Sequence, residues 1–255
     1  MNLHFKAVGD GQPLIILHGL LGSSDNWRTM SVRLSAYWRV FAVDLRNHGE
    51  SPHSEVFDYD AMVADLRRFS EQQELSRIAL MGHSMGGKVA MQFAFDNPER
   101  VDKLVVVDIA PKAYKPSQRN LLQALREIDL SRYNSFGDVD TALAGKITDR
   151  AVRQFVLKNL ARGEHGRLRW KLHLEAIYQN YDKLLPELVP QRVFPKPTLF
   201  IRGGRSSYIE DNDTELIRQF FTQAEIVTLS KADHWVHIDA PDEFFQKVHN
   251  FLSRA

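Results

Sequence analysis

The segment Gly82-His83-Ser84-Met85-Gly86 places a serine between closely spaced glycines. An apolar run ends just before it and a helix-like segment follows. Glycine loses more freedom on folding than any other residue, so this density of glycine indicates a tight turn. A G-x-S-x-G turn between a strand and a helix exposes the serine hydroxyl at the strand end. We predict that Ser84 is a nucleophile; the alternative is a tight turn with an incidental serine.

A serine hydroxyl needs a base that takes its proton, and the chain has ten histidines. His234 follows the last predicted strand and precedes the last predicted helix, at the same edge of the sheet as Ser84, so we predict that it is the base. His237 is predicted to pack nearby, although a His-x-x-His zinc pair is another interpretation of these two residues. His83 is predicted to be structural or to line the pocket.

The histidine in turn needs a buried carboxylate that fixes its tautomer. The usual place for this carboxylate reads IRGGRSSYIEDND, with serines where an aspartate is expected. Asp108 ends the preceding strand at the same edge of the sheet, and we favour it as the acid. The alternatives are Glu210, Asp211 and Asp213, which have the pattern of a solvated helix start.

An oxyanion that develops during acyl transfer needs two N–H donors aimed at it. We predict that these are the backbone N–H groups of Met85 and Leu20. Leu20 lies in the glycine-containing loop His18-Gly19-Leu20-Leu21-Gly22 after a strong predicted strand. His18 is expected to hold this loop by hydrogen bonds.

These residues need a sheet that brings strand ends together. Near-continuous apolar runs predict buried parallel strands; they cover residues 13–19, 39–45, 77–83, 103–111, 197–204 and 224–230. Apolar residues at spacings of three and four predict helices; these cover residues 24–38, 58–75, 88–101 and 242–255. The alternation of strand and helix predicts an α/β fold with a mostly parallel, doubly wound sheet.

The alternation stops after residue 111 and resumes at residue 197. Between these points we find only amphipathic stretches, at residues 117–128, 149–161 and 171–185. We therefore predict a core formed by residues 1–111 and 196–255, and a helical cap, or lid, formed by residues 112–195.

Charge is divided unevenly between these parts. Residues 111–196 contain 16 Lys and Arg against 9 Asp and Glu, while the whole chain has a net charge of +1. This balance gives no argument for a nucleic-acid partner. The absence of cysteine excludes disulfides and thiolate chemistry and fits a reducing compartment. With no signal-peptide pattern and no apolar run long enough to span a membrane, we expect a cytoplasmic protein.

The motifs together resemble those of the α/β-hydrolases, and within them the YbfF-type bacterial esterases. The segments that carry the resemblance are HGLLGSSDNW, VDLRNHGESP, GHSMGGK, VVDIAP, GGRSSYI and DHWVH. They occur in that subgroup's order and cover nearly the whole chain outside the cap. The subgroup is similar in lacking an aspartate after the cap, which favours Asp108. In VDLRNHGESP, Asn47 stands where many hydrolases have glycine, and Asp44, Arg46 and His48 are interpreted as a structural turn.

The resemblance implies an α/β-hydrolase fold with the cap inserted after the sixth strand. It implies a serine esterase or thioesterase that forms an acyl-enzyme on Ser84, with His234 as base and no metal or cofactor. The expected partner is a small acyl ester or thioester. The basic cap suggests an anionic substrate such as an acyl-CoA, with candidate contacts at Arg119, Arg162, Arg167, Arg169 and Lys171; the alternative is that these side chains form solvated helix faces.

Two other functions remain open. The same Ser–His arrangement serves carbon–carbon bond hydrolases and lyases, and a non-catalytic ligand-binding homologue could keep the fold. Dehalogenase and epoxide hydrolase chemistry needs an aspartate at the nucleophile position, so Ser84 argues against both. Acyl chain length and oligomeric state are not indicated by the sequence.

Overall fold

Seven strands form one sheet in the computed structural model, which describes residues 1–254 apart from the side chain of Glu164. The strand order is β1-β3-β2-β4-β5-β8-β9, and every neighbouring pair is parallel except β1 with β3. The strands are β1 (Phe5–Val8), β2 (Pro13–Leu17), β3 (Arg39–Val43), β4 (Ile78–His83), β5 (Val101–Val107), β8 (Thr198–Gly203) and β9 (Ala224–Leu229). The predicted doubly wound α/β fold is confirmed.

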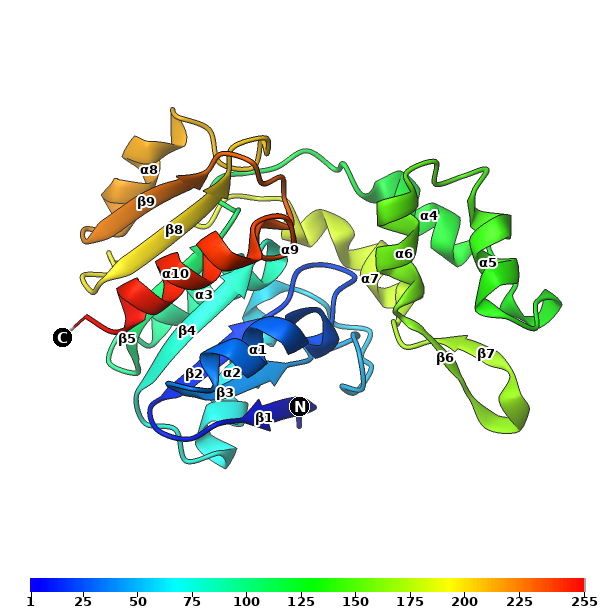
Figure 1. The fold of residues 1–255 in the computed structure, drawn as a ribbon, viewed down its shortest axis with the longest axis horizontal. Helices are drawn as coiled ribbons and strands as arrows, with labels where there is room; N and C mark the ends of the chain where they lie inside the picture. Colours follow the sequence, from blue (N-terminus) through cyan, green and yellow to red (C-terminus); the bar gives the residue numbers. More distant parts are fainter. Residues whose placement is uncertain (255) are drawn as a thin grey trace.

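Helices cover both faces of the sheet (Figure 1). One face packs on α2 (Tyr59–Gln72), α3 (Met85–Asp96) and α8 (Asp213–Phe220). The other packs on α1 (Arg28–Leu34), which follows the short helix η1 (Ser24–Trp27), and on α9 (Val236–Asp239) and α10 (Pro241–Leu252). Alternate residues of β2 enter opposite layers, with Ile15 and Leu17 in one and Leu14 and Ile16 in the other. Burial on both faces is why these strands are continuously apolar.

Local sequence sets several helix boundaries. Asp58 accepts a hydrogen bond from the Ala61 N–H (2.9 Å) and caps α2. Pro241 is the first residue of α10, where its missing N–H is tolerated. The predicted 242–255 helix ends at Leu252, and Ala255 lies outside the described residues.

Residues 112–195 are called the inserted segment here, and their helices lie beyond the carboxyl ends of the parallel strands (Figure 1). The end of the segment returns along the core, where Phe194 pairs with Phe221. Its helices are α4 (Arg119–Arg126), η2 (Leu130–Arg132), α5 (Phe136–Leu143), α6 (Arg150–Leu157), η3 (Glu164–Gly166), α7 (Leu174–Asn180) and η4 (Tyr181–Leu184). Polar contacts seat the segment on the core: His173 N–H donates to Asn47 O (3.0 Å), and the Asn159 side chain donates to Leu21 O (2.8 Å).

Two details differ from the expectation. The segment follows the fifth strand, β5, not the sixth, because only the short edge strand β1 precedes β2. The segment is also not wholly helical: β6 (Leu160–Arg162) and β7 (Leu168–Trp170) pair antiparallel. Three-residue strands are too short to show an alternating pattern in the sequence.

Candidate active site

The carboxyl edge of the sheet gathers the predicted site residues. Ser84 directly follows β4, Asp108 directly follows β5, and His234 lies in the loop after β9. Loops at this edge are where open α/β sheets bind ligands. Ser84 and His234 both line a single cavity of about 990 Å³.

The backbone at Ser84 is held in an uncommon conformation. Ser84 has φ 52° and ψ −119°, and its N–H donates to Val107 O (3.0 Å). A non-glycine residue with positive φ stores strain, which is typical of functional sites. A Cβ on Gly86 would lie 2.4 Å from His18 O, and one on Gly82 would lie 2.1 Å from Gly86 O. The glycines are therefore required because the backbones on either side of the turn nearly touch.

Asp108 contacts the imidazole of His234. Asp108 Oδ2 lies 2.8 Å from His234 Nδ1, and the carboxylate is fully buried. Because a carboxylate only accepts, Nδ1 carries the proton and Nε2 is left as the base nitrogen. Asp108 also accepts from Gly203 N–H (2.9 Å) and from the Ser206 hydroxyl.

The loop after β8 supports this pair in a way that sequence reasoning missed. Ser206 donates to Asp108, and the Tyr208 ring stacks on His234 with centroids 3.8 Å apart. The available signal was that Ser206 and Ser207 stand where an aspartate was expected. A hydroxyl at that place can orient the carboxylate that comes from the neighbouring strand.

The competing carboxylates have other partners. Asp211 pairs with Arg202 (2.6 Å) and is largely exposed. Asp213 pairs with Lys112 (2.6 Å), and Glu210 lies 3.6 Å from the same lysine. None of the three has a hydrogen bond to His234 among the described residues, so the geometry favours Asp108.

The loop that carries Leu20 comes close to the nucleophile. A Cβ on Gly19 would lie 3.0 Å from His83 Nδ1 and 3.2 Å from Ser84 Cβ, so a larger residue would press on the nucleophile turn. Met85 is the first residue of α3, at the end where backbone N–H groups have no partner within the helix and the helix dipole is positive. An oxyanion site needs two N–H donors, and their assignment to the backbone of Leu20 and Met85 stays a prediction.

Two buried histidines hold the Leu20 loop. His18 donates from Nδ1 to Gly19 O (2.8 Å) and accepts at Nε2 from Leu45 N–H (3.0 Å). His48 accepts at Nε2 from Leu21 N–H (3.1 Å). Burial lowers the pKa of His18 and lowers that of His48 to about 3, so both rings are neutral. The predicted structural role of His18 is confirmed.

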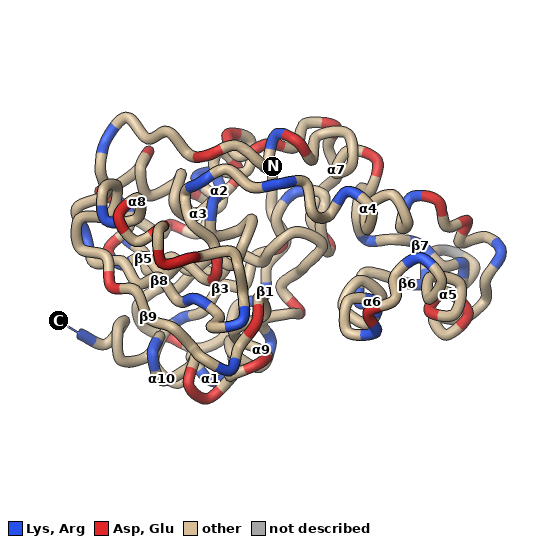
Figure 2. Tube along the Cα trace, turned by 90° about the horizontal axis from the view of Figure 1, so that it is seen from above, with Lys and Arg blue, Asp and Glu red and all other residues tan. Residues whose placement is uncertain are grey.

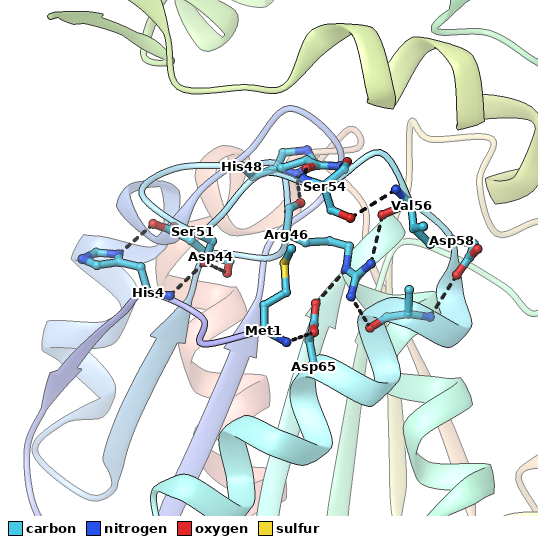
Figure 3. Close-up of polar contacts among 12 residues, drawn as sticks. Met1, His4, Asp44, Arg46, His48, Ser51, Ser54, Val56, Asp58 and Asp65 are labelled. Carbon is cyan, nitrogen blue, oxygen red and sulfur yellow. Dashed lines mark hydrogen bonds and ion pairs between the residues drawn. The ribbon is translucent and has the colours of Figure 1, made fainter.

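The turn after β3 is a hydrogen-bonded cluster (Figure 3). Asp44 accepts from Ser24 N–H (2.6 Å), Glu50 N–H (3.0 Å) and His4 Nδ1 (2.8 Å). Arg46 donates to Asp65 (2.7 Å) and to two backbone carbonyls. These contacts confirm the structural interpretation of the turn.

Asn47, in the same turn, has φ 66°. Asparagine tolerates this left-handed region better than most residues, which explains how it replaces the glycine of many hydrolases.

The remaining two histidines near Ser84 are packing residues. His83 donates from Nε2 to the backbone carbonyl of His234 (2.9 Å) and so holds the His234 loop. His237 stacks on Trp27, with ring centroids 4.1 Å apart. Burial lowers the pKa of both, that of His237 to about 3. Within residues 1–254, no three His, Cys, Asp or Glu side chains are grouped as a metal site, which leaves the zinc interpretation without a third ligand.

The basic side chains at the cavity are not the ones expected. Arg119, Arg162, Arg167, Arg169 and Lys171 do not line it. Arg119 pairs with Asp182, and Lys171 pairs with Glu50 (2.9 Å). The lysines that do line the cavity are Lys88, Lys112, Lys115 and Lys158. Lys88 was missed, although the sequence shows it as the one charge in the helical run KVAMQFAF.

Comparisons with known proteins identify the family and support the fold. A family model described as the alpha/beta hydrolase fold matches residues 12–136. The sn-1-specific diacylglycerol lipase ABHD11 of Danio rerio is 37% identical over 97% of this chain and 80% of its own length. The chain belongs to the α/β-hydrolase family.

Two further relatives extend the match over the whole chain. Esterase YbfF of Escherichia coli strain K12 is 30% identical, over 96% of this chain and 94% of its own length. A solved structure described as a marine microorganism esterase has a TM-score of 0.96 and 39% identity, covering 98% of this chain and 99% of that one. This α/β-hydrolase is therefore close to YbfF-type esterases. The described residues include no helix long and apolar enough to cross a membrane.

Proposed function

We propose that the protein is a serine hydrolase that cleaves carboxylic esters through an acyl-enzyme on Ser84. The observation that carries the proposal is the 2.8 Å contact between Asp108 and His234 beside a strained Ser84 in one cavity. The names of the relatives, esterase and lipase, support the same activity.

The mechanism follows from the atoms available. His234 Nε2 takes the proton of the Ser84 hydroxyl as its oxygen attacks the ester carbonyl. The Leu20 and Met85 N–H groups stabilise the oxyanion, and the buried Asp108 carboxylate stabilises the imidazolium. His234 then protonates the departing alcohol. Water, deprotonated by His234, attacks the acyl-enzyme, and collapse of the second oxyanion releases the acid and restores Ser84.

We propose the domain organisation predicted above. Residues 1–111 and 196–255 form the catalytic core, and the inserted segment, residues 112–195, is its cap. Leu121, Val152 and Phe155 of the inserted segment line the same cavity as Ser84, which supports a role in enclosing the acyl group. An apolar wall suits an alkyl chain.

A finer proposal is that anionic substrates, including thioesters such as acyl-CoA, are drawn to this cavity. Lys115 and Lys158 are exposed and line it, and so does Lys112, which is paired with Asp213. Figure 2 shows Lys and Arg along much of the inserted segment. Positive charge around a cleft raises the local concentration of anions.

The test is hydrolysis of p-nitrophenyl esters from acetate to palmitate by wild type and Ser84→Ala. We expect turnover by wild type and its loss in the variant, with the chain-length profile reporting the reach of the cavity. Ester turnover that survives in Ser84→Ala would contradict the proposal. No turnover of any ester would favour carbon–carbon bond chemistry or a non-catalytic role.

A further inference from the structure

A lysine lies inside the helix that follows the nucleophile. Lys88 is on α3, four residues after Ser84, and is only 1% exposed. Four residues of α-helix advance about 6 Å and return to the same face, so Lys88 lies about one helical turn further along α3 than Ser84. Both residues line the cavity. A lysine this buried needs an explanation, because desolvation of an ammonium is unfavourable unless it is compensated.

The protein satisfies only part of the hydrogen-bonding capacity of Lys88. Its ammonium has three N–H donors. Within the part of the chain that the structure describes, its one hydrogen bond goes to Pro186 O, 2.6 Å away. The rings of Tyr59 and Tyr114 lie near, with centroids 5.7 and 5.1 Å from Nζ. Aromatic faces attract a cation but do not accept its N–H bonds as an oxygen does.

Neither tyrosine hydroxyl forms a hydrogen bond with the Lys88 ammonium among the described residues. Tyr59 donates to Leu184 O (3.0 Å), and Tyr114 donates to Tyr208 O (2.7 Å) while accepting from Ala110 N–H (2.8 Å). The two rings therefore border the Lys88 ammonium without accepting its hydrogen bonds. The remaining donors of Lys88 are left for a group that enters the cavity.

Lys88 also lacks a paired counter-charge among the described residues. The structure shows no ion pair for it, although Glu187 on the segment after η4 is near enough to favour its charged form. Burial outweighs that effect and lowers the pKa of Lys88 to about 8. Lys112 also lies near the Tyr114 ring, 5.5 Å from its centroid, but it is paired with Asp213. Because no carboxylate of the described residues is paired with Lys88, the charge that would complete the surroundings of Lys88 is negative.

We propose that Lys88 binds the distal carboxylate of the acyl group, so that the preferred substrates are half-esters of dicarboxylic acids. This inference rests on the proposed ester hydrolysis at Ser84. The scissile carbonyl lies at Ser84, and the acyl chain runs along the cavity wall past Met85 to the ammonium. The carboxylate supplies both the missing acceptor and the missing negative charge. Such a contact fixes the direction in which the acyl group enters.

The experiment compares ethyl half-esters of succinate, glutarate and adipate with ethyl esters of unsubstituted acids of matched length, by following ethanol release. We expect wild type to have a kcat/KM about 10- to 100-fold higher for one or more half-esters, the range expected for a hydrogen bond to a charged group. This preference should decline as pH rises through about 8, because the free enzyme then loses the ammonium charge. Turnover of neutral esters should show no parallel decline.

Lys88→Met keeps the length of the side chain and removes its charge. We expect it to abolish the half-ester preference, because kcat/KM should fall about 10- to 100-fold more for the half-esters than for the neutral esters. Lys88→Arg should restore part of the preference. Lys146→Met is the matched control, since this exposed lysine of the inserted segment pairs with Glu127 and does not line the cavity.

The alternative is that Lys88 only ties α3 to Pro186 at the end of the inserted segment. In that case Lys88→Met would lower turnover of both ester classes equally, or would fail to fold while wild type shows no half-ester preference. Either result overturns the inference. Efficient Ser84-dependent hydrolysis of neutral esters with no half-ester preference would overturn it and leave the proposed function standing. Absence of hydrolysis of every ester overturns both.

Discussion

Ser84 and Asp108 are both non-glycine residues with positive φ, 52° and 50°. Each directly follows a central strand, and each has its N–H bound to the neighbouring strand: Ser84 to Val107 O and Asp108 to Ile201 O. These hydrogen bonds to the sheet keep both residues in their strained backbone conformation, so the sheet fixes the positions of the two side chains. At the scale of single residues, the site is therefore built before substrate arrives.

We expect Asp108→Asn to lower kcat by about 10³- to 10⁴-fold, because an amide no longer selects the tautomer that leaves Nε2 as a base. The measurement is steady-state hydrolysis of a p-nitrophenyl ester, with unfolding midpoints to confirm that the variant folds. Asp211→Asn is the matched control and should stay near wild type, since Asp211 pairs with Arg202. An equal loss from Asp211→Asn alone would overturn the assignment.

Sequence reasoning reached Ser84, His234 and Asp108 as candidates because strand ends and chain order place them at one edge of the sheet. It did not reach Ser206, Tyr208 or Lys88. Their relevance depends on side-chain contacts: Ser206 with Asp108, Tyr208 stacked on His234, and Lys88 at the cavity wall. No spacing rule encodes such contacts between separate loops.

At the scale of elements, the loop after β2 and the turn after β3 act as one unit. His18 and His48 join them through Leu45 N–H and Leu21 N–H. The rings must stay neutral for this, because each accepts a backbone hydrogen bond at Nε2. The geometry of the Leu20 loop thus depends on the protonation state of buried histidines.

We expect folding stability to fall as pH drops from about 6.5 toward 3. Burial lowers the pKa of His48 in the folded protein to about 3, below its ordinary value of 6.5, so the unfolded chain binds the extra proton across this window. Stability is fully present above that window and is lost within it, at about 1.4 kcal/mol per pH unit for one histidine. The measurement is urea unfolding at a series of pH values.

His48→Gln tests the assignment, because the glutamine oxygen can accept from Leu21 N–H but does not titrate. The variant should lose about 1.4 kcal/mol per pH unit of the slope between pH 4 and 6. Above pH 7, where both states of the wild-type histidine are neutral, the difference between the two proteins should be constant. An unchanged slope below pH 6 would show that His48 does not carry it.

The elements themselves were largely predictable, and the exceptions have a common cause. The six apolar runs all contain strands of the sheet, since burial on both faces leaves a strong signal. The largely exposed β1 and the three-residue β6 and β7 were missed. Short or partly exposed strands are defined by their pairing partners more than by their own residues.

At the scale of the whole molecule, the basic inserted segment is seated on an acidic core. Contacts between them include Lys171 with Glu50 and the Asn159 side chain with Leu21 O. The uneven charge could be predicted from the sequence, but the way in which the inserted segment packs on the core could not. That packing decides which basic side chains reach the cavity: Lys115 and Lys158 line it, and the arginines that we expected do not.

We expect kcat/KM for an anionic thioester such as butyryl-CoA to fall about three- to ten-fold from low-salt to high-salt buffer, because salt screens attraction to the cavity lysines. Ethyl butyrate, which is neutral, should show no such fall. The double variant Lys115→Gln with Lys158→Gln should reduce the salt dependence. An equal change in kcat/KM with salt for the two substrates would contradict the proposal of an anionic substrate.

The most direct test of the account is labelling of the native protein with a fluorophosphonate, read by intact mass and peptide mapping. We expect one adduct per chain, on Ser84, and none in Ser84→Ala. Asp108→Asn should react much more slowly, since the base is no longer oriented. No adduct on wild type, or an adduct on another serine such as Ser206, would contradict the assignment of Ser84 as the nucleophile.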